Sequence, residues 1–134
     1  MAACAALMAG LVSGVAFTGT AYADSVTNIP FTATKSGNVF SGAVKKSNAT
    51  GTDAKVSLNQ TISEQYTVKV VTINSNDNIV SSDSATFHNV TPNVTMSIPY
   101  KSGKGVKGNY FRPRFSLVTG SATSSLPITF SYTA

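Results

Sequence analysis

The segment LPITFSYT, residues 126–133, decides the fold class. Its large apolar side chains stand at every second position, and Pro, Thr or Ser fills the positions between them: Leu126, Ile128, Phe130 and Tyr132 share one parity. Successive side chains of a β-strand point to opposite faces of a sheet. This period of two therefore predicts a strand with one face on a core and the other in water.

The same alternation recurs along the chain, and no segment shows convincing helical periodicity. Strands are predicted over residues 29–34, 39–44, 54–62, 66–73, 85–90, 93–100 and 110–118. Clusters of Gly, Asn, Asp and Ser separate them, as is typical of turns. Seven or eight short strands at this spacing predict one all-β domain, either a single antiparallel β-sandwich or a small barrel.

Two of these strands carry signs of irregularity. The apolar residues of 66–73 change parity after Val70, which predicts a β-bulge near residues 70–71. Pro113 lies within the strand predicted at 110–118. Because proline cannot donate a hydrogen bond to a neighbouring strand, it favours an edge strand or a bulge there.

The first 23 residues carry no charged side chain, and residues 2–17 resemble the apolar centre of a secretory signal peptide. Ala21-Tyr22-Ala23 fits a cleavage site, although no Lys or Arg precedes the apolar run. The alternative is a buried N-terminal helix or a membrane anchor, but the run is short for crossing a bilayer. We predict a leader at 1–23 that is cleaved after Ala23, and a secreted all-β domain at 24–134 without a transmembrane segment.

The predicted mature domain contains no cysteine, because Cys4 lies in the leader. An exported domain of this kind must fold without disulfide bonds. At about 110 residues it is long enough to bury one core.

The charges are distributed unevenly. All the carboxylates precede residue 84: Asp24, Asp53, Glu64, Asp77 and Asp83. Residues 84–134 carry five cations and no acid, so the net charge of +5 belongs to the C-terminal part of the chain. A local excess of this kind favours a surface that faces anions.

The candidate binding face lies in residues 99–117. A Gly-rich loop carries Lys101, Lys104 and Lys107 into the strand predicted from residue 110. If Phe111, Phe115 and Leu117 face the core, the other face presents Tyr110, Arg112 and Arg114. Arginine binds phosphate or carboxylate through its planar fork. The alternative is that these charges only protect a sheet edge and keep the protein soluble.

Catalytic chemistry has little support in the sequence. His88 is the only histidine, and no acid lies within four residues of it, so we expect a partly exposed strand residue. Residues 74–78 imitate the start of a calcium loop but lack the glycine and the bidentate glutamate that follow in such loops, so they predict a hairpin turn. We expect no catalytic residue, no metal and no cofactor.

The composition is compatible with three functions. The first is a non-enzymatic, secreted, envelope-associated binding or structural domain, whose basic face contacts an anionic polymer, lipid headgroups or a glycan. The second is a secreted antimicrobial or toxin-like effector, and the third is a small hydrolase. Since the predicted domain is exported and only one Tyr joins the basic row, we expect no nucleic acid partner. The oligomeric state is left open by the sequence.

Overall fold

The computed structural model describes residues 21–22, 25–118, 121 and 123–134, and within them the chain forms strands and no helix. The strands are β1 (Ala21–Tyr22), β2 (Ser25–Thr34), β3 (Asn38–Val39), β4 (Ala43–Lys45), β5 (Ala54–Leu58), β6 (Ile62–Ile73), β7 (Ala85–Val90), β8 (Thr95–Ile98), β9 (Tyr110–Leu117) and β10 (Ser125–Thr133). The all-β prediction is confirmed. The segment predicted at 39–44 is divided between β3 and β4.

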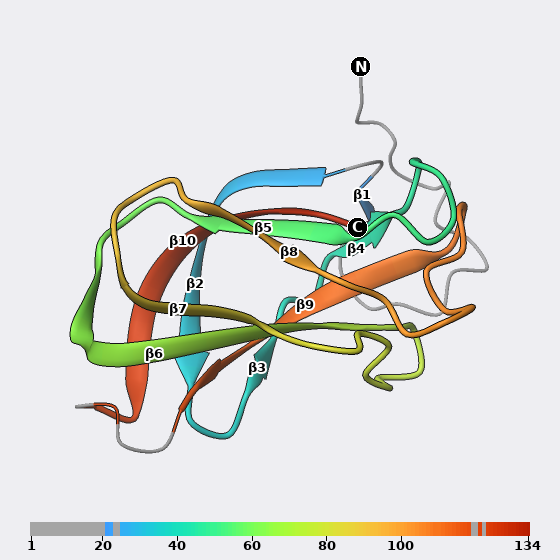
Figure 1. Ribbon diagram of the computed structural model, residues 1–134. Helices are drawn as coiled ribbons and strands as arrows, with labels where there is room; N and C mark the ends of the chain where they lie inside the picture. Colours follow the sequence, from blue (N-terminus) through green and yellow to red (C-terminus); the bar gives the residue numbers. More distant parts are fainter. Residues whose placement is uncertain (1–20, 23–24, 119–120, 122) are drawn as a thin grey trace.

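The strands form one mixed sheet that is nearly closed into a barrel (Figure 1). The path around it runs β7-β6-β9-β2-β10-β5-β8, and β3 and β4 also pair with β9. Most neighbours are antiparallel, as predicted, but β1 with β4 and β2 with β9 are parallel pairs. Of the two predicted architectures, the sheet is therefore closer to the small barrel.

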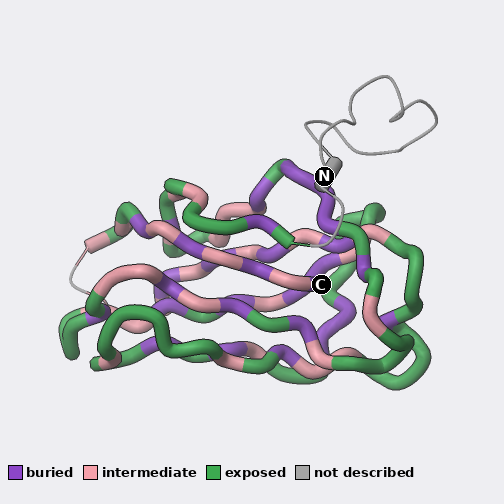
Figure 2. Tube along the Cα trace, turned by 90° about the horizontal axis from the view of Figure 1, so that it is seen from above, coloured by how far each residue is buried: buried purple, intermediate pink, exposed green. Residues whose placement is uncertain are grey.

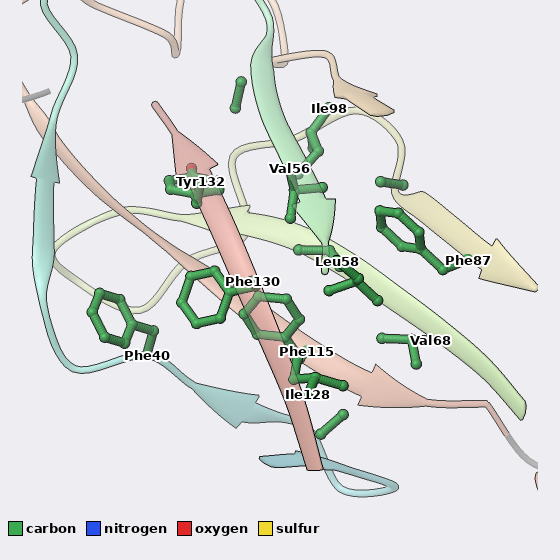
Figure 3. Close-up of a cluster of buried hydrophobic side chains, with 14 of the residues drawn as sticks. Phe40, Val56, Leu58, Val68, Phe87, Ile98, Phe115, Ile128, Phe130 and Tyr132 are labelled. Carbon is green, nitrogen blue, oxygen red and sulfur yellow. The ribbon is translucent and has the colours of Figure 1, made fainter. Parts of the chain in front are cut away.

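The core fills the barrel with the residues that the alternation places inside. Buried and partly exposed residues alternate strictly along β9, and a similar alternation is visible around the barrel (Figure 2). Phe115 from β9 and Phe130 from β10 lie at the centre, with ring centroids 4.6 Å apart (Figure 3). Phe31 and Phe40 pack edge-on against Phe130 at 5.8 and 5.3 Å. Aromatic pairs favour such tilted arrangements over face-to-face stacking.

The bulge predicted at residues 70–71 is wrong. β6 pairs with β9 in unbroken register from Val68 to Ile73. The apolar residues change parity because both faces of this strand end are covered: Thr72 points inward and Ile73 outward, and both are buried. The register shifts elsewhere: in β6 between Ile62 and Thr67, opposite β7, and in β2, where residues 27–28 lie opposite Ser131 and Asn28 adopts a φ of 53°.

Pro113 does not mark an edge strand, because β9 is paired on both sides, so this alternative is wrong; the pairing opposite Pro113 is irregular instead, since residues 40–43 lie opposite 112–113. The carbonyl oxygen of Pro113 accepts a hydrogen bond from the backbone N–H of Phe40, which lies between β3 and β4. The nitrogen and carbonyl of one strand residue point to the same side. The Pro113 nitrogen, which has no hydrogen to donate, therefore faces the interruption between β3 and β4. The strands form no regular ladder of hydrogen bonds there.

The predicted leader lies outside the described residues except for β1, which pairs with Ala43 and Val44 of β4.

Candidate functional site

The lysine-bearing loop lies at one end of the barrel, beside the loops that follow β4 and β6 (Figure 1). Backbone hydrogen bonds join the three loops. The N–H of Gly51 donates to the carbonyl of Gly105 at 2.8 Å, and the N–H of Lys101 donates to the carbonyl of Val80 at 2.8 Å. Gly105 is required for close packing here, because a Cβ at this position would lie 2.6 Å from ring atoms of Tyr100. The loop is thus held by its neighbours.

The three lysines of this loop are exposed. Lys101 reaches across to the loop after β6, where its Nζ donates to the carbonyl of Ile79 at 3.3 Å. Lys104 and Lys107 make no side-chain hydrogen bond or ion pair to the described part of the chain. Their ammonium groups are therefore available to an external anion.

The outer face of β9 carries Tyr110, Arg112 and Arg114, each half-buried, while Phe111 and Phe115 point into the core. The predicted division of β9 into two faces is confirmed. The neighbouring strand adds one more cation to this face, because Lys45 of β4 lies directly opposite Tyr110.

The two arginines are tied to the protein itself. The Arg112 guanidinium forms an ion pair with Asp77, which comes from the turn after β6. Nη2 of Arg114 donates to the carbonyl of Ser36 at 3.0 Å. The segment is free of acids in sequence, yet the fold brings a carboxylate to it from 35 residues away. The outer face of β9 therefore carries less net positive charge than the sequence of β9 alone predicts.

Gly37 determines where Arg114 lies. Gly37 has a φ of +89°, and a Cβ on it would lie 2.3 Å from Nε of Arg114. The guanidinium thus occupies the space that any other residue would fill with its side chain. Glycine meets both requirements at position 37, because it adopts a positive φ without strain and has no side chain.

A surface groove of about 360 Å³ lies on this face. Its lining residues come from three parts of the chain: Val39, Ser41, Ile73, Asp77, Arg112 and Arg114. The arrangement puts two guanidiniums, one carboxylate and one hydroxyl around aliphatic side chains.

Lys46 is a polar residue that the sequence analysis missed. Its side chain is fully buried, and Nζ donates to Oδ1 of Asn48 at 2.5 Å and to the carbonyl of Thr52 at 2.6 Å. Burial lowers the pKa of Lys46, and the nearby Asp53 carboxylate opposes this by raising it. The signal was present in the sequence, since Lys46 has the same parity as the buried Val44.

A cluster of polar side chains continues from Lys46 into the barrel. Nζ lies 4.9 Å from the ring centroid of Tyr100, a distance at which an ammonium is attracted to an aromatic face. The hydroxyl of Tyr100 is buried near that of Tyr132 but outside hydrogen-bond geometry, and the Tyr132 hydroxyl lies 2.9 Å from Oγ1 of Thr72. Burial raises the pKa of both tyrosines. This cluster supports the end of the barrel from within.

His88 is exposed on β7, where its Nδ1 lies 2.9 Å from the Thr67 hydroxyl and 3.0 Å from the Tyr66 carbonyl oxygen. Residues 74–78 form the predicted hairpin turn: Oδ1 of Asn74 accepts hydrogen bonds from the backbone N–H groups of Asn76 and Asn78. Within the described segments, no group of three or more His, Cys, Asp or Glu side chains could hold a metal ion.

Comparison of the chain with known protein families, with characterised proteins and with solved structures gives no match. None of the residues described forms a helix with the length and apolar character that crossing a bilayer requires.

Proposed function

We propose that this protein is a non-enzymatic, exported binding domain that attaches to an anionic polymer of the cell envelope. The observation that carries the proposal is the loop at the barrel end, where the ammonium groups of Lys104 and Lys107 extend into solvent from a backbone held by neighbouring loops. A positioned cation loses less conformational freedom on binding than one on a loose segment.

The lysine loop is a better candidate than the arginine row for the main contact. Arg112 is paired with Asp77, and Arg114 is bonded to the Ser36 carbonyl, so neither adds its full charge to the surface. Lys45, on the strand beside Tyr110, extends the basic surface on the other side. Four exposed lysines therefore surround the start of β9: Lys45, Lys101, Lys104 and Lys107.

The test is sedimentation of the protein with an isolated wall polymer of uronic-acid-containing sugars, bound to beads, at increasing salt. Screening shortens the range of attraction to about 8 Å at 0.15 M ionic strength, so binding should weaken steeply as salt rises. Each cation near an anionic surface contributes about 1 kcal/mol, so changing both Lys104 and Lys107 to Gln should weaken binding roughly 30-fold.

The matched control is Lys35→Gln combined with Lys69→Gln, because both lysines are exposed and lie beside Ser116, at the opposite end of β9 from the lysine loop. Binding that ignores salt, or that falls equally in the control, would show that the lysines serve only solubility. Vesicles containing phosphatidylglycerol provide the second arm. Preference for the vesicles, together with leakage of their contents, would favour a membrane-active effector over a polymer-binding domain.

Export is part of the proposal and has its own test. The small residues at 21 and 23 and the polar start at Asp24 support cleavage after Ala23. N-terminal sequencing of the protein from the culture medium should begin at Asp24. An intact Met1 on the exported product would contradict it.

A further inference from the structure

The groove between β3, β9 and the turn after β6 has features that the lysine loop lacks. The loop offers separate ammonium groups in water, whereas the groove places charged and apolar groups around one volume of about 360 Å³. Small-molecule sites are concave, largely apolar and carry a few positioned polar groups, with volumes from about 300 Å³ upward.

The register of the sheet explains why these residues meet. Arg114 lies opposite Val71 on β6 and Val39 on β3, and Arg112 lies opposite Ile73. Directly opposed residues share a face of a sheet. Branched aliphatic side chains therefore flank both guanidiniums on the outer face.

Both guanidiniums are held in place before any ligand arrives. Arg114 is bonded to the Ser36 carbonyl and fills the space over Gly37, and Arg112 is paired with Asp77. An arginine has five N–H donors in a planar fork, so the hydrogen bond of Arg114 to the Ser36 carbonyl leaves others for a carboxylate. Positioned donors of this kind reduce the entropy lost on binding.

The charge of the groove selects among anions. Two guanidiniums and one carboxylate give the lining residues a net charge of +1. This balance matches a ligand with a single negative charge better than a phosphate group, which carries about −1.5 to −2 at neutral pH. Asp77 and Ser41 add oxygen atoms that accept hydrogen bonds from hydroxyl groups.

We infer that this groove binds an acidic sugar unit, that is, a sugar ring carrying one carboxylate. The carboxylate pairs with Arg114, the ring hydroxyls donate to Asp77 and Ser41, and the aliphatic C–H face of the ring packs against Val39. The inference rests on the proposed function, since it names the repeating unit of the anionic polymer. Lys101, bonded to Ile79 two residues from Asp77, connects the groove with the lysine loop.

The experiment is a nuclear magnetic resonance titration of the folded protein with D-glucuronic acid, D-glucose and inorganic phosphate. Glucuronic acid should shift the amide signals of residues 38–41, 73, 112 and 114 at lower concentration than either of the other two. Arg114→Lys keeps the charge but loses the planar fork, so it should weaken glucuronic acid binding about tenfold. Asp77→Asn should shift the preference toward phosphate, because it raises the net charge of the groove.

Lys104→Gln combined with Lys107→Gln is the control and should leave the glucuronic acid titration unchanged. Equal binding of glucose would overturn the inference, because it would mean that the guanidiniums take no part. Stronger binding of phosphate than of glucuronic acid would overturn it as well, as would a titration without shifts at these residues. Salt-dependent polymer binding through the lysines could persist in each case, so the proposed function and this inference can fail separately.

Discussion

Nζ of Lys46 lies 4.9 Å above the ring of Tyr100, so a buried ammonium closes one end of the barrel. The backbone of Lys46 also pairs with the lysine loop, accepting from the N–H of Gly108 at 2.7 Å and donating to the carbonyl of Asn109 at 2.9 Å. One residue thus connects the polar cluster, the loop after β4 and the loop that carries the proposed binding lysines.

Lys46→Met should lower the free energy of unfolding by about 1–3 kcal/mol, because the carbonyl of Thr52 and Oδ1 of Asn48 lose a charged donor. Lys45→Met, at the exposed neighbouring position, should change it by less than about 0.5 kcal/mol. Urea denaturation measures both. Equal effects would mean that the buried ammonium adds nothing to stability.

The pH dependence of stability should reveal the buried tyrosines. In the unfolded chain a phenol ionises near pH 10, whereas burial raises the pKa of Tyr132 and Tyr100 in the folded state. Above pH 10 the folded state therefore binds more protons than the unfolded state, and the free energy of unfolding falls as pH rises. Tyr132→Phe should make this fall less steep, as measured by urea denaturation from pH 9 to about 12.

Lys46 should change the pH dependence of stability in the opposite direction. Because burial lowers its pKa, the unfolded state holds the proton more strongly, and its contribution to stability rises as pH approaches the ordinary value of 10.5. Lys46→Met should therefore make the alkaline fall steeper. Slopes that move in the same direction in both variants would contradict the assignment.

Gly37 and Gly51 offer a matched pair for testing the contact with Arg114. Their φ angles are +89° and +90°, but only at Gly37 would a Cβ meet other atoms. Alanine should cost about 1–2 kcal/mol at either position through backbone strain. Gly37→Ala should cost at least about 1 kcal/mol more, because the guanidinium must move. This excess should vanish when Arg114 is also changed to Ala, as a double-mutant cycle would show.

The aromatic pair at the centre of the core should dominate stability. Phe115 and Phe130 are fully buried, so truncating either to Ala should cost about 3–5 kcal/mol. Val94→Ala, at an exposed position, is the control and should be near neutral. Because the described part of the chain contains no cysteine, thermal unfolding should have the same midpoint with and without reductant. A helical circular dichroism spectrum would contradict the fold.

The strands could be predicted because a period of two is a local signal. Ile128, Phe130 and Tyr132 are buried as their alternation predicts. Lys46 obeys the same alternation, but its charge argued for the surface, and only its hydrogen-bond partners explain why it is buried. The pair of Asp77 and Arg112 was beyond prediction, because it depends on how β6 turns back beside β9. The bulge prediction was wrong for the same reason, because the burial of Ile73 depends on residues that are distant in the sequence.

The near-closure of the sheet has a consequence for how the folded protein moves. In the part of the chain that the structure describes, β7 pairs only with β6 and β8 only with β5, whereas β9 and β10 have partners on both sides. The two open edges are consecutive in the chain and pack against each other without a ladder of hydrogen bonds. Local opening follows the weakest backbone pairing, so deuterium should enter the amides along this seam long before those of β9 and β10. The barrel therefore opens locally between β7 and β8, and β6 separates this seam from β9, the strand that carries the arginines.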